Sequence, residues 1–255
     1  MLYLLLIIVG ITAGFINVMA GGGSLLTLPM LIFMGLPSQV ANGTNRLAIL
    51  METFIGVNNF KSKGYFDIKR GIIYALPAIV GAIIGSNIAI NLSEEIFNKL
   101  LGMILLVMLV IIIFQPHKKI KYKKIIEKDN KNSLLVGSLL FFFVGIYGGA
   151  IQAGVGFLII TTLTIVTNYK LVKINSLKAL IVFIYTIPTL YIFIKSGNVD
   201  FLKGLILATG NSIGAYIGSN LQIEKGDKIV KIILSVVMVI MALKLLEVSR
   251  LWVNL

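Results

Sequence analysis

Long uncharged apolar segments alternate with short polar segments along this chain. No Asp, Glu, Lys or Arg occurs in residues 1–45, 71–93, 132–169 or 204–223. A helix needs about 20 apolar residues to cross a bilayer core of about 30 Å. The apolar positions are continuous and do not alternate as they do in the strands of a membrane β-barrel. The pattern therefore predicts an all-α polytopic membrane protein with about 8–10 membrane segments.

The first and third uncharged segments are too long for one helix, so each is expected to turn back within the membrane. The most plausible points are Gly21–Gly23 and Gly154–Gly156. Three further spans follow in each half of the chain. They are expected near residues 45–60, 71–92 and 96–114 in the first half, and near 178–194, 204–222 and 230–247 in the second.

The two halves also match each other in sequence. GAIIGSN (81–87) and GAYIGSN (214–220) differ at one position and lie 133 residues apart (214 − 81). The same offset places Asp67 on Asp200, and it places the glycine triplet on residues 154–156. Several matches in one register predict an internal duplication. For the GAxIGSN segments themselves, tight helix packing is the favoured interpretation, because small residues line helix crossings in membranes.

The duplication divides the chain into three parts: a first transmembrane repeat (1–115), a basic cytoplasmic linker (116–132) and a second transmembrane repeat (133–255). Five segments in each half would make the repeats inverted. Counting the glycine-rich stretch as a re-entrant hairpin would give four spans and parallel repeats. We prefer the inverted count, because it places the basic loops 61–70, 117–131 and 224–228 on one side of the membrane, as cytoplasmic loops should be.

Composition supports a membrane protein and narrows its chemistry. The chain is 58% hydrophobic and only 13% charged, and its mean hydropathy is +0.98. The net charge of +13 is best explained by cytoplasmic loops and anionic lipid headgroups, so no nucleic-acid partner is expected. With no cysteine, a single histidine (His117) and no H-E-x-x-H motif, the sequence predicts no metal site, no cofactor and no enzymatic activity.

The two glycine-rich breaks are the best candidates for a substrate site. Glycine tolerates unusual backbone torsions and lets a ligand approach the main chain. A helix that restarts after such a break presents free N–H groups and partial positive charge to an anion. Matching interruptions in two halves mark the binding site of many transporters. The candidates are Gly21, Gly22, Gly23 and Ser24 in the first half, with Gln152, Gly154 and Gly156 in the second.

A second candidate element is ANGTNR (41–46). Its polar residues suit a turn followed by a helix start, with Thr44 or Asn45 as the N-cap and Arg46 in the first turn. The counterpart in the second half contains Ser176 and Lys178. These two cations can attract or bind an anion, or they can snorkel to lipid headgroups. Gly43, Thr44, Asn45, Arg46, Ser176 and Lys178 therefore join the substrate-binding candidates.

Glu52 is the single acid between Arg46 and Asp67, well inside a predicted span. Carboxylates within a membrane are costly and often serve proton coupling. The alternative is a structural pair with Arg46 or with a polar neighbour. The residues do not decide between these roles.

The segment AGGGSLLTLPMLIFMGLPSQVANGTNR, with its degenerate second copy, resembles the TauE/SafE family of sulfite exporters, also called the 4-toluene sulfonate uptake permease family. The likeness covers nearly the whole chain. It implies a multi-pass permease that moves a small sulfur-containing anion, often outward, and it points to Gly21, Gly22, Gly23, Pro29, Gly43 and Thr44. The second half departs from the motif at Val155 and Thr162, so the two repeats are not expected to contribute equally.

The combined expectation is a permease of the cytoplasmic membrane that moves sulfite, a sulfonate or a related acid by alternating access between the repeats. A passive anion channel and a permease for a different anion are the alternatives. Expected partners are the anion, the lipid bilayer and protons as a coupling ion. A homo-oligomer is compatible with the sequence, which does not fix the oligomeric state.

Overall fold

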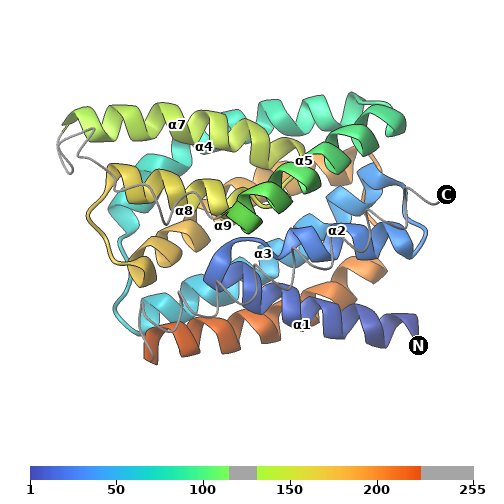
Figure 1. Cartoon of the computed structure of the whole chain (residues 1–255), viewed down its shortest axis with the longest axis horizontal. Helices are drawn as coiled ribbons and strands as arrows, with labels where there is room; N and C mark the ends of the chain where they lie inside the picture. The colour runs from blue at the N-terminus through green and yellow to red at the C-terminus, as the bar shows by residue number, and fades with distance from the viewer. Residues whose placement is uncertain (115–130, 225–255) are drawn as a thin grey trace.

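The computed structural model describes residues 1–114 and 131–224, and the regular structure in those two ranges is entirely helical (Figure 1). The predicted all-α membrane class is confirmed. His117, most of the basic linker, the loop after Glu224 and the predicted span at 230–247 lie outside the described residues. The helices of the first half are α1 (Leu2–Ala20), α2 (Ser24–Phe33), α3 (Ser38–Ser62), α4 (Ile68–Asn91) and α5 (Glu94–Phe114). Those of the second are α7 (Lys131–Ala150), α8 (Val155–Val166), α9 (Leu171–Lys195) and a helix at residues 201–224.

Helix boundaries recur at the offset found in the sequence. The bounds of α9 lie 133 residues beyond those of α3, and the 201–224 helix lies 133 residues beyond α4. Asp67 caps α4 by accepting the Arg70 N–H at 3.2 Å, and Asp200 caps the 201–224 helix by accepting the Lys203 N–H at 2.9 Å. Partial burial acts to raise the pKa of Asp67. The hydrogen bonds that its carboxylate accepts from the Tyr169 hydroxyl and the Arg70 N–H outweigh this effect, so the pKa lies below its usual value.

The expected helix start at Thr44 or Asn45 is wrong. α3 begins at Ser38 after Pro37, so the whole ANGTNR segment is helical and Arg46 lies two turns inside the helix. Within a helix, Asn and Thr are less favourable than Ala by only about 0.7 kcal/mol. Their side chains here bond to neighbouring helices, and this tertiary pairing outweighs the local preference.

Helices at equivalent positions in the two halves run in opposite directions. The Thr44 hydroxyl near the start of α3 accepts the N–H of Asp200, which follows the end of α9. Gly56, near the other end of α3, faces Ala179 in the first half of α9, so the two helices are antiparallel. In Figure 1, α1 runs from the N-terminus toward the middle of the molecule and α2 turns back toward the same end. α7 and α8 form the matching hairpin from the opposite end.

The fourth helix of each half packs against the first helix of the other half. A Cβ atom at Gly85 of α4 would overlap the Ile146 carbonyl of α7, and one at Gly145 of α7 would overlap the Ala78 carbonyl. The 201–224 helix packs on α1 in the same way, where Gly14 meets the backbone of Asn211. Such backbone contact is possible only with glycine. The packing interpretation of the GAxIGSN segments agrees with these contacts.

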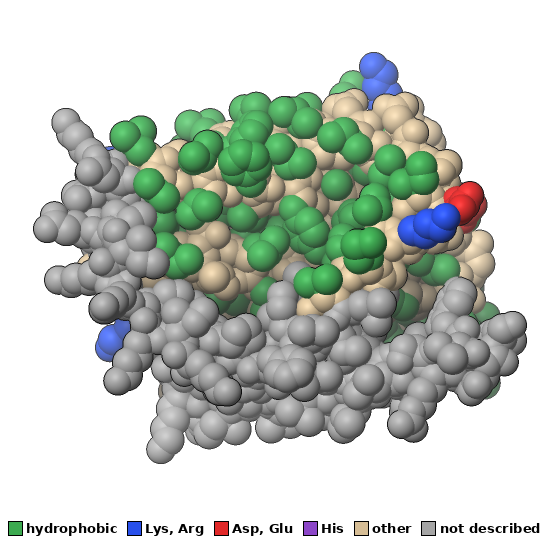
Figure 2. Space-filling view, turned by 45° about the horizontal axis from the view of Figure 1, so that its top comes forward, with side chains coloured by type: hydrophobic (Ala, Val, Ile, Leu, Met, Phe, Trp, Pro, Cys, Tyr) green, Lys and Arg blue, Asp and Glu red, His purple; other side chains and the backbone are tan. Residues whose placement is uncertain are grey.

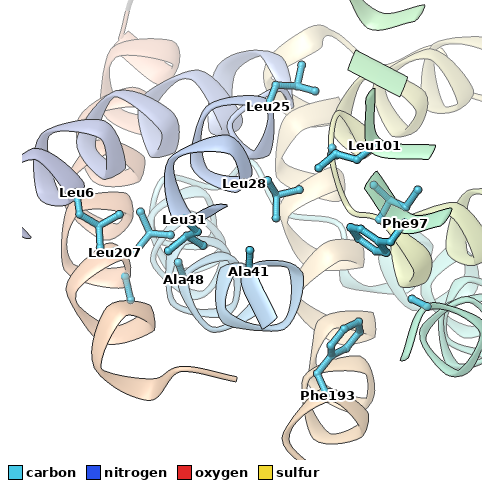
Figure 3. Packing of buried hydrophobic residues seen from close by; sticks show 14 of the residues in the cluster. Leu6, Leu25, Leu28, Leu31, Ala41, Ala48, Phe97, Leu101, Phe193 and Leu207 are labelled. Atoms are coloured by element: carbon cyan, nitrogen blue, oxygen red, sulfur yellow. The ribbon is translucent and has the colours of Figure 1, made fainter. Parts of the chain in front are cut away.

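Apolar side chains fill the interior and also cover the outside of the molecule. Leu25, Leu28 and Leu31 of α2 are buried in one cluster with Phe97 of α5 and Phe193 of α9 (Figure 3). Figure 2 shows hydrophobic side chains spread over the visible described surface, with charged side chains near its edges. In the described part of the chain, three helices are long and apolar enough to cross a membrane: Leu2–Ala20, Ile68–Asn91 and Leu171–Lys195.

We expect Gly85→Ala to destabilise the protein by about 1–3 kcal/mol, because the added methyl group forces the α4 and α7 backbones apart. Gly102→Ala in α5 is the matched control, since a Cβ atom there meets nothing within 4 Å and the change gains helix propensity of up to about 1 kcal/mol. Thermal unfolding of both variants in detergent measures the difference. Equal unfolding midpoints would show that the glycine contact does not hold the two helices together.

Candidate functional site

The two broken helices touch each other at their breaks. α1 ends at Gly21, whose φ of 86° lies in the left-handed region that favours glycine. A Cβ atom on Gly21 would overlap the backbone of Gly156, and one on Gly156 would overlap the backbone of Gly21. Both positions therefore require glycine, and the breaks meet inside the protein.

The second break lies slightly before the predicted position. Residues 151–154 separate α7 from α8, so Gly156 belongs to the first turn of α8. Gln152 has a φ of 66° and Gly154 a φ of 70°. A non-glycine residue in this region is uncommon and is tolerated where surrounding contacts hold it. The Gln152 side chain accepts bonds from Arg46 at 3.5 Å and from the Tyr185 hydroxyl at 3.3 Å.

A small cavity lies beside the contact between Gly21 and Gly156. Its volume is about 20 Å³, room for roughly one water molecule. The first residues of α2 and α8 line it, so the partial positive charge of two helix N-termini faces the same space. The polar residues and glycine that line it are Asn17, Ser24, Glu52, Thr53, Gln152, Gly156 and Lys178.

Lys178 of α9 lies between this cavity and the C-terminal end of α1. Its ammonium donates to the carbonyl of Asn17 at 2.7 Å and to that of Val18 at 2.8 Å. Asn175, one turn earlier, donates to the Met19 carbonyl at 3.0 Å. The Val18 and Met19 carbonyls at the end of α1 gain donors in this way, and the Asn17 carbonyl also accepts the Gly21 N–H at 2.8 Å. The cation also complements the negative end of the helix dipole.

Arg46 of α3 plays the same part for α7. Its guanidinium donates to the Gly149 carbonyl at 2.5 Å and to the Thr189 hydroxyl at 3.2 Å, and it lies 4.5 Å from the centre of the Phe193 ring. Asn42, one turn earlier, donates to the Ala150 carbonyl at 2.7 Å. Snorkelling to headgroups is wrong for both cations, because Arg46 and Lys178 are at most 4% exposed.

Glu52 is held by two amide groups. Its Oε1 accepts from the Asn17 amide at 2.6 Å and its Oε2 accepts from the Asn211 amide at 2.7 Å. The Arg46 guanidinium bonds instead to groups of α7, α9 and the second break, so the predicted pair with Arg46 is wrong. A polar pairing is present, and proton coupling stays a prediction.

The remaining predicted residues lie around the site and outside the cavity. Asn45 donates to the Ser24 hydroxyl at 3.1 Å, which orients the start of α2. Gly22 lies against the Phe157 ring, and the Gly23 N–H donates to the Asn17 amide oxygen at 3.3 Å. The other three candidates do not line the cavity. Gly43 packs on the Asn198 carbonyl, Thr44 accepts from Asp200, and Ser176 is fully buried.

The polar residues of the site that were not predicted as substrate ligands include Asn17, Asn42, Thr53, Asn175 and Asn211. Asn42 and Asn175 lie 133 residues apart and make equivalent bonds, so the repeat register contained a signal for them. Asn17 and Asn211 have no such partner. Within the described residues, no group of three His, Cys, Asp or Glu side chains could hold a metal ion.

We expect Asn42→Ala and Asn175→Ala to destabilise the protein by similar amounts, about 1 kcal/mol each, because each leaves one helix-end carbonyl without its donor. Asn58→Ala is the control, since Asn58 is exposed and bonds only within its own helix. Unfolding midpoints in detergent give the comparison. A loss in Asn58→Ala as large as in the other two would count against this role.

Comparison with known proteins identifies the family to which the chain belongs. The family model described as sulfite exporter TauE/SafE matches residues 6–245. A probable membrane transporter protein, ORF9 of Sinorhizobium sp, is 24% identical over 94% of this chain and 91% of its own length. The probable membrane transporter protein YfcA of Escherichia coli K12 is 24% identical over 96% of this chain and 90% of its own length. No solved structure gives a significant match.

Proposed function

The chain belongs to the TauE/SafE family of sulfite exporters and is a membrane transporter, and from this premise we propose that it moves a small sulfur-containing anion, such as sulfite or a sulfonate, out of the cell. The proposed location is the cytoplasmic membrane, which the chain crosses several times. Three described helices of sufficient length and an apolar outer surface support this placement.

The observation that carries the proposal is the cavity at the meeting point of the two breaks. The first residues of two helices and the side chain of Lys178 line it, and helix N-termini and a lysine each favour a negative charge. Ser24 and Gln152 add side chains that can bond to an oxyanion. Unwound backbone inside a membrane is tolerated only where protein or a cavity satisfies it, which is the arrangement at both breaks.

Alternating access fits the small size of this cavity. Room for one water molecule is too little for a polyatomic anion, so the substrate must enter through a more open state. The antiparallel course of α3 and α9, and the recurrence of helix boundaries at one offset, support inverted repeats. We expect the rigid units to combine both halves, because the glycine contacts join α4 to α7 and α1 to the 201–224 helix.

The two buried cations have different parts in this proposal. Lys178 lines the cavity and would contact the anion directly. Arg46 does not line it. Arg46 holds the end of α7 and the side chain of Gln152, so it positions a residue that does face the cavity. This assignment changes the role that the sequence suggested for Arg46.

Efflux from proteoliposomes tests the function. Vesicles loaded with sulfite, thiosulfate, a small sulfonate or a carboxylate control should show saturable efflux of one of the sulfur anions. Lys178→Met should lower this flux at equal substrate concentration by about tenfold or more, because a charge-assisted contact to the anion is lost. Lys173→Met is the matched control, since Lys173 lies on the same helix but outside the cavity, within 3.7 Å of Asp67.

Efflux of no sulfur anion from correctly inserted protein would contradict the proposed substrate class. Equal flux in Lys178→Met and Lys173→Met would show that Lys178 does not contact the substrate, and it would not contradict the proposed substrate class.

A further inference from the structure

The Glu52 carboxylate occupies a set of donors that suits an anion in general. Each of its two oxygens accepts one amide N–H, from Asn17 of α1 and from Asn211 of the 201–224 helix. The side chain is 1% exposed and faces the cavity into which Lys178 also points. In the described part of the chain, Glu52 makes no ion pair within 4.0 Å.

The groups around Glu52 contain one positive charge. α1 and the 201–224 helix each present an amide, and α9 presents Lys178. Arg46, on the same helix as Glu52, bonds to groups at the end of α7 and in α9 and does not line this cavity. The surroundings can thus balance one negative charge, which an ionised Glu52 or a bound anion can supply.

We infer that the amides of Asn17 and Asn211, together with Lys178, form an oxyanion site that Glu52 fills in the closed state and that the transported anion takes over. This inference rests on the proposed function and deepens it. A carboxylate, a sulfite and a sulfonate share two acceptor oxygens on one centre, so each can accept both amides. The adjoining cavity is too small to hold a substrate beside the carboxylate, so the anion has to replace Glu52.

Where Glu52 is ionised, its replacement by an anion requires a proton. Two negative charges next to one ammonium would leave one of them buried and unpaired, which is strongly unfavourable. Glu52 therefore binds one proton from solvent and withdraws as a neutral carboxylic acid when a monovalent anion enters. One proton is taken up for each anion bound, and the net charge of the site stays the same. A proton thus accompanies the anion, so the driving force for flux is the sum of the anion gradient and the proton gradient, and no net charge crosses with a monovalent anion.

Removing the carboxylate tests the site without any transport assay. Glu52→Ala should leave the donor set empty and open to a free anion. Acetate, which has the same carboxylate, and methanesulfonate should each raise the unfolding midpoint of Glu52→Ala in detergent by several degrees, since ligands of the folded state stabilise it. Ile49→Ala is the matched control, because Ile49 is equally buried on the same helix and its loss creates an apolar space. That variant should show no such rise.

A second measurement uses the wild-type protein, in case Glu52→Ala does not fold. Titration of methanesulfonate in buffers of different ionisation enthalpy should show uptake of about one proton per anion, and apparent affinity should fall about tenfold per pH unit where Glu52 is ionised. Methanesulfonate keeps its charge across this range, so the proton is assigned to the protein.

Anion stabilisation of Glu52→Ala no larger than that of Ile49→Ala would overturn the inference, as would binding to wild type without proton uptake. Neither result would depend on whether sulfite is transported. Conversely, suppose that acetate raises the unfolding midpoint of Glu52→Ala but the wild-type protein transports no sulfur anion. That result would support the oxyanion site and contradict the proposed substrate class.

Discussion

Two helices of this protein stop inside it, and the carbonyl groups at their ends have to be satisfied there. The last carbonyls of any helix lack partners within the helix, and no water is available in the core of a bilayer. Carbonyls at the end of α1 accept hydrogen bonds from Lys178 and Asn175 of α9. Carbonyls at the end of α7 accept them from Arg46 and Asn42 of α3. All four of these side-chain donors come from the other half of the chain. Much of the arrangement of the molecule follows from this cross-pairing.

One consequence concerns how the halves are joined. Because each third helix reaches the broken helix of the opposite half, the two breaks are drawn together until Gly21 and Gly156 touch. The fourth helices are exchanged as well, with α4 on α7 and the 201–224 helix on α1. The closely packed pairs of helices therefore each combine one helix from the first half of the sequence with one from the second half.

Another consequence concerns charge. The protein keeps two cations buried for structural reasons, and one of them also borders the cavity. A buried cation that bonds only to neutral carbonyls remains attractive to an anion. Glu52 is the acidic side chain that lines the same cavity, and its oxygens accept from the amides of Asn17 and Asn211. A helix-end cap and an anion site can therefore share the same ammonium, which links the stability of the break to its proposed use.

The sequence by itself determined the class, the approximate spans, the positions of the breaks to within three residues, and the offset of 133 residues, because hydropathy, glycine runs and repeated segments are local properties of the chain. It also marked Arg46, Glu52 and Lys178, since ionisable groups in apolar spans are conspicuous. The predicted start of α3 within ANGTNR was wrong, because it relied on the preference of Asn and Thr for helix N-caps. Only the tertiary structure decided what these groups touch. The partners of Arg46, Glu52 and Lys178 lie 35 to 161 residues away in the chain, and no local pattern specifies contacts over that separation.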